Sequence, residues 1–101
     1  MPVMAIYRRD DVSAELYEKF RASAPLDAAP LGALAHSNGR VGPGFVSVDI
    51  WEDAAAMETY INDVLIPATA ALGIKFERPE IIEVQTFIAT PGAQKFTIPF
   101  A

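Results

Sequence analysis

The sequence contains no cysteine and a single histidine, His36, among its 101 residues. The lack of cysteine excludes disulfides and thiolate metal sites and leaves the redox compartment open. Apolar residues never run for the roughly eighteen positions that a membrane helix needs. The net charge of −5 argues against nucleic acids and anionic membranes, because both bind basic surfaces. No charged leader precedes an apolar stretch, so we expect a cytoplasmic protein without a signal peptide.

The chain is rich in apolar residues for its size. They make up 51 % of the sequence, and the length is that of one small domain. A domain this small buries well under about 70 % of the surface of its unfolded chain, so a partner subunit would stabilise it. The composition therefore hints at buried surface beyond a single core.

Residue patterns predict four strands and two helices in the order βαββαβ. We expect strands over 2–8, 31–37, 45–51 and 80–89, and helices after Ser13 and Asp53, which are typical N-caps. Pro25 would end the first helix, and Pro67 would kink or interrupt the second. Residues 38–44 are expected to form a turn-rich connection. This order predicts the α+β, ferredoxin-like fold, a four-stranded antiparallel sheet with both helices on one face.

Two further segments have simple interpretations. Residues 1–90 would form the domain, and residues 91–101, with Pro91 and Pro99, an extended C-terminal arm. The charge run from Arg8 to Asp11 is most simply a solvated corner.

The last two strands are apolar on both faces. Two helices cover only one face of a sheet, and an apolar face left open would associate with another surface. The pattern therefore predicts a homodimer in which the two sheets pack together. In one strand alternation separates Val46, Val48 and Ile50 from Phe45 and Trp51, and in the other it separates Ile82, Val84 and Ile88 from Ile81 and Phe87.

Three segments carry a resemblance to a known family. They are "GALAHSNGRVGPG" (32–44), "FVSVDIWEDAAAMETYI" (45–61) and "PEIIEVQTFI" (79–88). Over roughly residues 3–90 the chain resembles the antibiotic-biosynthesis-monooxygenase-like family of dimeric α/β-barrel proteins. The resemblance implies a homodimer with a cavity between helices and sheet in each subunit. Such proteins include cofactor-free oxygenases of polyketide quinones, haem-degrading enzymes, isomerase-like proteins and proteins without known activity; related barrels include cyclases that use a histidine.

The sequence departs from the haem-degrading members of this family. Those members pair an asparagine on the first strand with a histidine on the second helix. Here the first strand offers Ile6 and Tyr7, the second helix has no histidine, and Trp51 alone remains from that set. The departures argue against haem as substrate; haem binding stays an alternative that predicts a coloured protein.

His36 is the natural candidate for a general base, because its unperturbed pKa lies near neutrality. The alternative is a strand-end histidine bonded to the backbone. Asp49 shares a strand face with Trp51 and is placed to orient His36 across the hairpin, although it could instead lie at a solvated edge or pair with an arginine. These two residues are our candidates for catalysis, with no metal and no cofactor.

Four residues are candidates for binding the substrate. Trp51 would stack on an aromatic substrate or plug the core where strand meets helix. Tyr7 and Tyr60 would donate hydrogen bonds, although Tyr60 lies on the apolar stripe of its helix and also fits core packing. Asn38 has a weaker claim, because Asn-Gly suits a tight turn.

Two function hypotheses follow. The first is a cofactor-free monooxygenase-like enzyme, or a related cyclase or isomerase, acting on a small aromatic or polyketide-like molecule. The second is a non-catalytic homodimer that binds a small hydrophobic ligand. The orientation of His36 and Asp49 separates them: side chains pointing into a cavity favour the enzyme.

Overall fold

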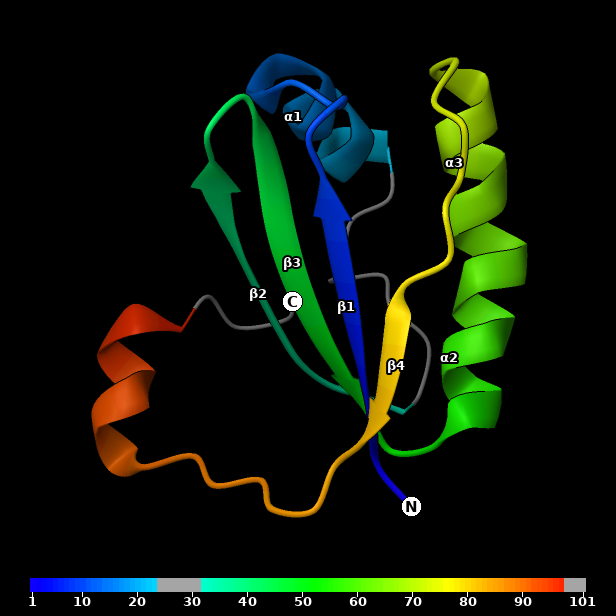
Figure 1. Ribbon diagram of the computed structural model, residues 1–101. Helices are drawn as coiled ribbons and strands as arrows, with labels where there is room; N and C mark the ends of the chain where they lie inside the picture. The colour runs from blue at the N-terminus through cyan, green and yellow to red at the C-terminus, as the bar shows by residue number, and fades with distance from the viewer. Residues whose placement is uncertain (24–31, 98–101) are drawn as a thin grey trace.

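A computed structural model describes residues 1–23 and 32–97. Its strands are β1 (Val3–Arg9), β2 (Ala33–Val41), β3 (Gly44–Trp51) and β4 (Glu80–Glu83). They form one antiparallel sheet in the order β2-β3-β1-β4, with α1 (Ala14–Ser23) and the α2–α3 helix on the same face (Figure 1). The α2–α3 helix joins α2 (Ala54–Tyr60), the π-helical turn η2 (Ile61–Leu65) and α3 (Ile66–Ala71). The predicted ferredoxin-like fold is confirmed.

Both predicted N-caps are confirmed. The Ser13 Oγ accepts a hydrogen bond from the Leu16 N–H at 3.2 Å, and the Asp53 Oδ1 accepts one from the Ala56 N–H at 2.8 Å. Each bond satisfies a backbone donor that the first turn of a helix leaves open. These two side chains therefore determine where the helices begin.

Pro67 alters the second helix without ending it. It has no N–H to donate, so the regular pattern of hydrogen bonds cannot continue through it. The helix widens just before Pro67 into η2, where the Ile66 N–H donates to the Ile61 carbonyl, and then resumes as α3. It ends at Ala71, Gly73 follows with a φ of +72°, and the Ile74 N–H donates to the Thr69 carbonyl.

The predicted turn between β2 and β3 is wrong. Residues 38–41 continue β2, and the chain reverses over Gly42 and Pro43 alone. Gly42 takes a φ of +54°, the sign that the first position of a two-residue type II′ turn requires. Asn38 therefore lies in a strand, two residues beyond His36, and points to the same face.

The last strand is shorter than predicted. Glu83 pairs with Val3, the first residue of β1, so the sheet offers no partner strand beyond it. Within the expected extended arm, residues Pro91–Phe96 instead form a 3-10 helix (η3) away from the other helices (Figure 1). Predictions for Pro25, residue 31 and residues 98–101 fall outside the described residues.

The core lies between the sheet and the α2–α3 helix. The predicted helical stripe is confirmed, since Met57, Tyr60 and Ile61 are at most 2 % exposed. They pack with Val3 and Trp51 from the sheet. Within the described part of the chain, no helix is long and apolar enough to cross a membrane.

The opposite face of the sheet carries no helix in the described residues. Strand pairing places Met4, Ile6, Val48 and Ile50 together on this face, with Ile82, which is 43 % exposed, beside them. We call these residues, with Val46, the open sheet face. It is the apolar face that the sequence predicts, and the helices leave it uncovered.

Candidate active site

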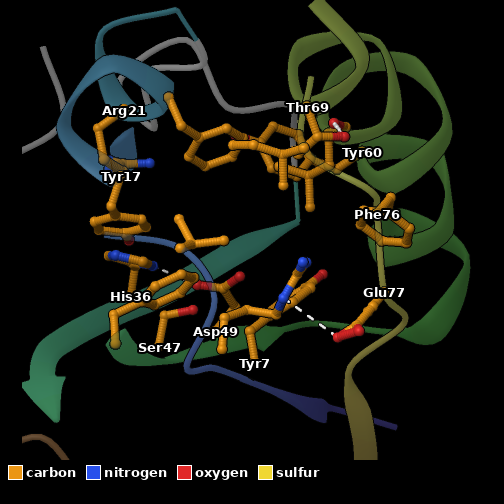
Figure 2. A pocket seen from close by; sticks show the side chains of 16 residues that line it. Tyr7, Tyr17, Arg21, His36, Ser47, Asp49, Tyr60, Thr69, Phe76 and Glu77 are labelled. Carbon is orange, nitrogen blue, oxygen red and sulfur yellow. Dashed lines mark hydrogen bonds and ion pairs between the residues drawn. The ribbon is translucent and has the colours of Figure 1, made fainter. Parts of the chain in front are cut away.

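A cavity of about 70 Å³ lies between the inner face of the sheet and the two helices. One water molecule needs only about 10–15 Å³ of such space, so the cavity has room for part of a small ligand. Side chains from the sheet and from the helices converge on it (Figure 2). Its apolar lining consists of Val12, Phe20, Phe45, Leu65, Ile74 and Phe76.

His36 and Asp49 lie at the wall of this cavity and contact each other. They are directly opposite in the β2–β3 ladder, and the His36 Nδ1 is hydrogen-bonded to the Asp49 Oδ1 (Figure 2). Asp49 is only 7 % exposed, and a carboxylate that is buried in this way needs such a partner. The predicted contact across the hairpin is thus present, and both side chains line the cavity.

Asn38 occupies the other ring nitrogen of His36. The Asn38 Nδ2 lies 2.8 Å from the His36 Nε2, on the exposed side of the pair. Asn38 does not line the cavity itself; it lines an adjoining groove between α1 and the hairpin, together with Arg40. The groove and the cavity share Tyr17, Arg21 and Phe45.

Three tyrosines line the cavity, including the predicted Tyr7 and Tyr60. Burial raises the pKa of each tyrosine. The pKa of Tyr17 rises to about 12, although the charge of Arg21 opposes this shift. The nearby charge of Asp49 further raises the pKa of Tyr7. All three hydroxyls therefore keep their protons near neutral pH and remain hydrogen-bond donors.

The Tyr60 hydroxyl has no hydrogen-bond partner among the described residues, although its oxygen is buried. The residue as a whole is 2 % exposed and lines the cavity. A buried hydroxyl without a partner costs about 1–3 kcal/mol. An acceptor atom of a ligand in the cavity would remove that cost.

Trp51 lies in the core and is absent from the cavity lining. It is 2 % exposed, and its ring centroid lies 5.2 Å from that of Tyr60. Trp51 thus occupies the position of the alternative interpretation, a core plug at the strand–helix junction. Trp51 acts on the cavity through Tyr60, whose ring it supports.

Two arginines of the cavity were not among the predicted site residues. Arg9, expected in a solvated corner, is 9 % exposed. Its Nε and Nη2 donate to the Asp11 carboxylate at 2.9 Å, and its Nη1 donates to the Lys75 carbonyl at 2.9 Å. The bond to Lys75 links the segment after α3 to the sheet, and the hydrogen bond from Arg9 lowers the pKa of Asp11. Arg21 lines the cavity from α1.

The lining offers hydrogen bonds and apolar contacts rather than metal ligands. No group of three or more His, Cys, Asp or Glu side chains that could hold a metal ion occurs in residues 1–23 and 32–97. The combination of an imidazole backed by a carboxylate, an apolar cavity and buried hydroxyl donors suits proton transfer to and from a small, largely apolar molecule.

No family model matches the sequence, and no curated protein matches it. Several solved structures share its fold. SnoaB, a cofactor-independent oxygenase from Streptomyces nogalater, is 16 % identical and aligns over 88 % of this chain and 93 % of its own, with a TM-score of 0.57. A protein of unknown function from Nitrosomonas europaea is 21 % identical over 90 % and 94 % of the two chains, with a TM-score of 0.61.

The haem-degrading protein MhuD from Mycobacterium tuberculosis is also similar. It is 20 % identical and aligns over 87 % of this chain and 97 % of its own, with a TM-score of 0.50. Identities this low establish a common fold and leave the reaction open. The fold expected from the resemblance is the fold that these solved structures share.

Proposed function

We propose that this protein is a homodimeric, cofactor-free monooxygenase-like enzyme that acts on a small aromatic or polyketide-like phenol. The observation that carries the proposal is the His36–Asp49 pair at the wall of an apolar cavity. A phenol has an acidic O–H for a base and a flat apolar ring for such a cavity. The likeness to SnoaB, a cofactor-independent oxygenase with the same fold, supports this choice.

His36 is the general base in this proposal, and Asp49 orients it. Asp49 accepts the Nδ1 proton, which leaves the lone pair of Nε2 to take the proton of the phenol. The resulting phenolate is electron-rich and reacts with dioxygen. One oxygen atom becomes a new ring carbonyl and the other leaves as water, and the four electrons that dioxygen gains come from oxidation of the phenol to a quinone.

The tyrosines and aromatic residues bind the substrate. Tyr60 donates its unpartnered hydroxyl to an oxygen of the ligand, and Tyr7 is a second donor from the sheet. Donors placed where negative charge develops stabilise the transition state.

The homodimer is proposed from the open sheet face. Its apolar side chains lack a helix in the described part of the chain, and a second copy of the same face would bury them symmetrically. Native mass spectrometry of the wild-type protein should give twice the mass of the chain. Val48→Glu, in the middle of this face, should give monomers, whereas Asn62→Glu on an exposed helix surface should not; a monomeric wild-type protein would contradict the homodimer.

The function is tested by incubating the protein with a panel of hydroxylated naphthalenes and anthrones. An oxygenase consumes dioxygen and yields a product that has gained one oxygen and lost two hydrogens. A product of unchanged mass would instead indicate an isomerase or a cyclase that uses His36 as its base. Binding without any product across the panel would favour the ligand-binding alternative.

A further inference from the structure

Both ring nitrogens of His36 are bonded to side chains, and this fixes where the ring proton lies. Nδ1 contacts the Asp49 carboxylate, and Nε2 lies 2.8 Å from the Asn38 amide nitrogen. An ionised carboxylate only accepts hydrogen bonds, so Nδ1 must carry a proton. In the neutral ring Nε2 is then unprotonated, and the Asn38 N–H donates to its lone pair.

The amide of Asn38 fits both charge states of the ring. An asparagine side chain ends in one donor group and one acceptor group of nearly equal size. When Nε2 gains a proton, a half-turn of the amide brings its oxygen to the new N–H. Neither an alanine nor an aspartate at this position offers both groups, so the fit depends on the amide.

Asn38 also stands where a ligand would reach the base. It lies on β2, the edge strand of the sheet, and its side chain is exposed. An amide displaced from Nε2 can therefore form hydrogen bonds with water instead. The groove that Asn38 lines shares Tyr17, Arg21 and Phe45 with the cavity. The amide therefore covers the reactive nitrogen beside a groove that adjoins the cavity.

We propose that Asn38 is a positioning residue that caps the Nε2 of His36 and turns its amide when the ring gains a proton. A substrate hydroxyl must displace this cap to reach the base; this last step rests on the proposed function, whereas the cap itself does not. The role differs from the direct substrate binding expected for Asn38 from the sequence.

His36 shares the cavity with other titratable and charged groups besides Asp49. The titratable and charged groups that line the cavity with His36 come from β1, α1, α2 and the segment after α3. They are Tyr7, Arg9, Tyr17, Arg21, Tyr60 and Glu77. A substitution at position 38 leaves all of them in place, so its effect on the ring reports on Asn38.

The cap is tested by acylation of His36 with diethyl pyrocarbonate, which attacks an unprotonated imidazole nitrogen. His36 is the only histidine, so mass spectrometry of its peptide in the full-length protein follows one site. Asn38→Ala uncovers the lone pair and should react about fivefold faster, the change expected when one ordinary hydrogen bond is lost. Asn38→Asp should react more slowly than wild type, because a carboxylate holds a proton on Nε2. Asn62→Ala, the same substitution on an exposed helix surface, should match wild type.

The ¹⁵N spectrum of the single labelled histidine gives a second reading. At a pH where the wild-type ring is neutral, the spectrum should show a protonated Nδ1 and an unprotonated Nε2, and at the same pH Asn38→Asp should show protons on both. An unchanged acylation rate in Asn38→Ala would overturn the cap. If Asn38→Asp were acylated as fast as Asn38→Ala, the claim that the amide follows the protonation state of the ring would be wrong. Asn38 would then only shield Nε2. Neither readout involves turnover, so a failure of the proposed function would be seen separately.

Discussion

The His36 imidazole and the Asp49 carboxylate face each other across the β2–β3 hairpin, and the carboxylate contacts Nδ1. Directly opposite positions in an antiparallel ladder bring two side chains to the same face at close range. The hairpin turn at Gly42 and Pro43 sets this register, and the pairing of β3 with β1 turns the pair toward the helices. The geometry of the pair is therefore a consequence of the sheet.

Replacing Asp49 by asparagine should remove the base without removing the fold. The amide N–H at position 49 donates to Nδ1, which drives the ring proton to Nε2 and takes away the lone pair. Turnover of any substrate found should fall by about 10²-fold or more, the lower end of what general base catalysis contributes. Steady-state kinetics check this, with Asn62→Ala as the control; an Asp49→Asn enzyme with wild-type kcat would refute the orienting role.

Tyr60→Phe should separate stability from ligand binding. The ring keeps its packing on Trp51, and the lost hydroxyl has no partner among the described residues. The free energy of unfolding should stay unchanged or rise by up to about 1 kcal/mol, because a buried donor without a bond is costly. Affinity for a phenolic ligand should fall about fivefold, the loss expected for one hydrogen bond. Urea unfolding and titration calorimetry measure the two effects, and a loss of stability with unchanged affinity would show that the hydroxyl serves the fold.

Stability should decline in alkaline solution because of the cavity tyrosines. Burial raises the pKa of Tyr17 to about 12, and it also raises the pKa values of Tyr7 and Tyr60, whereas tyrosines of the unfolded chain titrate near about 10. Between these values the unfolded chain binds fewer protons than the folded one, so the free energy of unfolding falls as pH rises from about 10 toward 12. Denaturant unfolding across this range should show the decline, and it should be shallower in Tyr17→Phe. Identical slopes in the two proteins would be inconsistent with a raised pKa of Tyr17.

Alanine should lower the free energy of unfolding at one glycine of the hairpin and leave it nearly unchanged at another. A Cβ on Gly44 would lie 1.8 Å from the Arg9 carbonyl oxygen, whereas a Cβ on Gly39 meets nothing within 4 Å. Gly44→Ala therefore forces β1 and β3 apart and should lower the free energy of unfolding by about 1–3 kcal/mol or more. Gly39→Ala should stay within about 0.5 kcal/mol of wild type. Thermal unfolding of both variants measures the two effects. A Gly44→Ala protein as stable as wild type would contradict the close approach of Gly44 to the Arg9 carbonyl.

Local rules predict much of this fold from the sequence. Ser13 and Asp53 cap their helices because a side-chain oxygen satisfies an open N–H wherever the helix lies. Strand alternation likewise separates Asp49 and Trp51 from Val48 and its neighbours on the open sheet face. These features depend on residues a few positions apart.

Features that depend on register or distant partners were harder to predict. Asn-Gly at 38–39 is a stronger turn signal than Gly-Pro at 42–43, yet pairing along the whole ladder places the turn at the second site. Arg9 looks like a surface charge because its partner carbonyl, that of Lys75, lies 66 residues away. The contact of Asn38 with His36 follows only once β2 is known to extend past residue 37.

The most direct measurement compares His36→Ala and Asn62→Ala with the wild-type protein on the same phenolic substrate. Oxygen consumption and product formation are followed together, and circular dichroism confirms that all three proteins are folded. A general base contributes about 10²–10⁴-fold, so His36→Ala should lose at least that lower factor while Asn62→Ala keeps full activity. Wild-type turnover by His36→Ala would contradict the role of His36 as the base, because the proton would then leave the substrate without it.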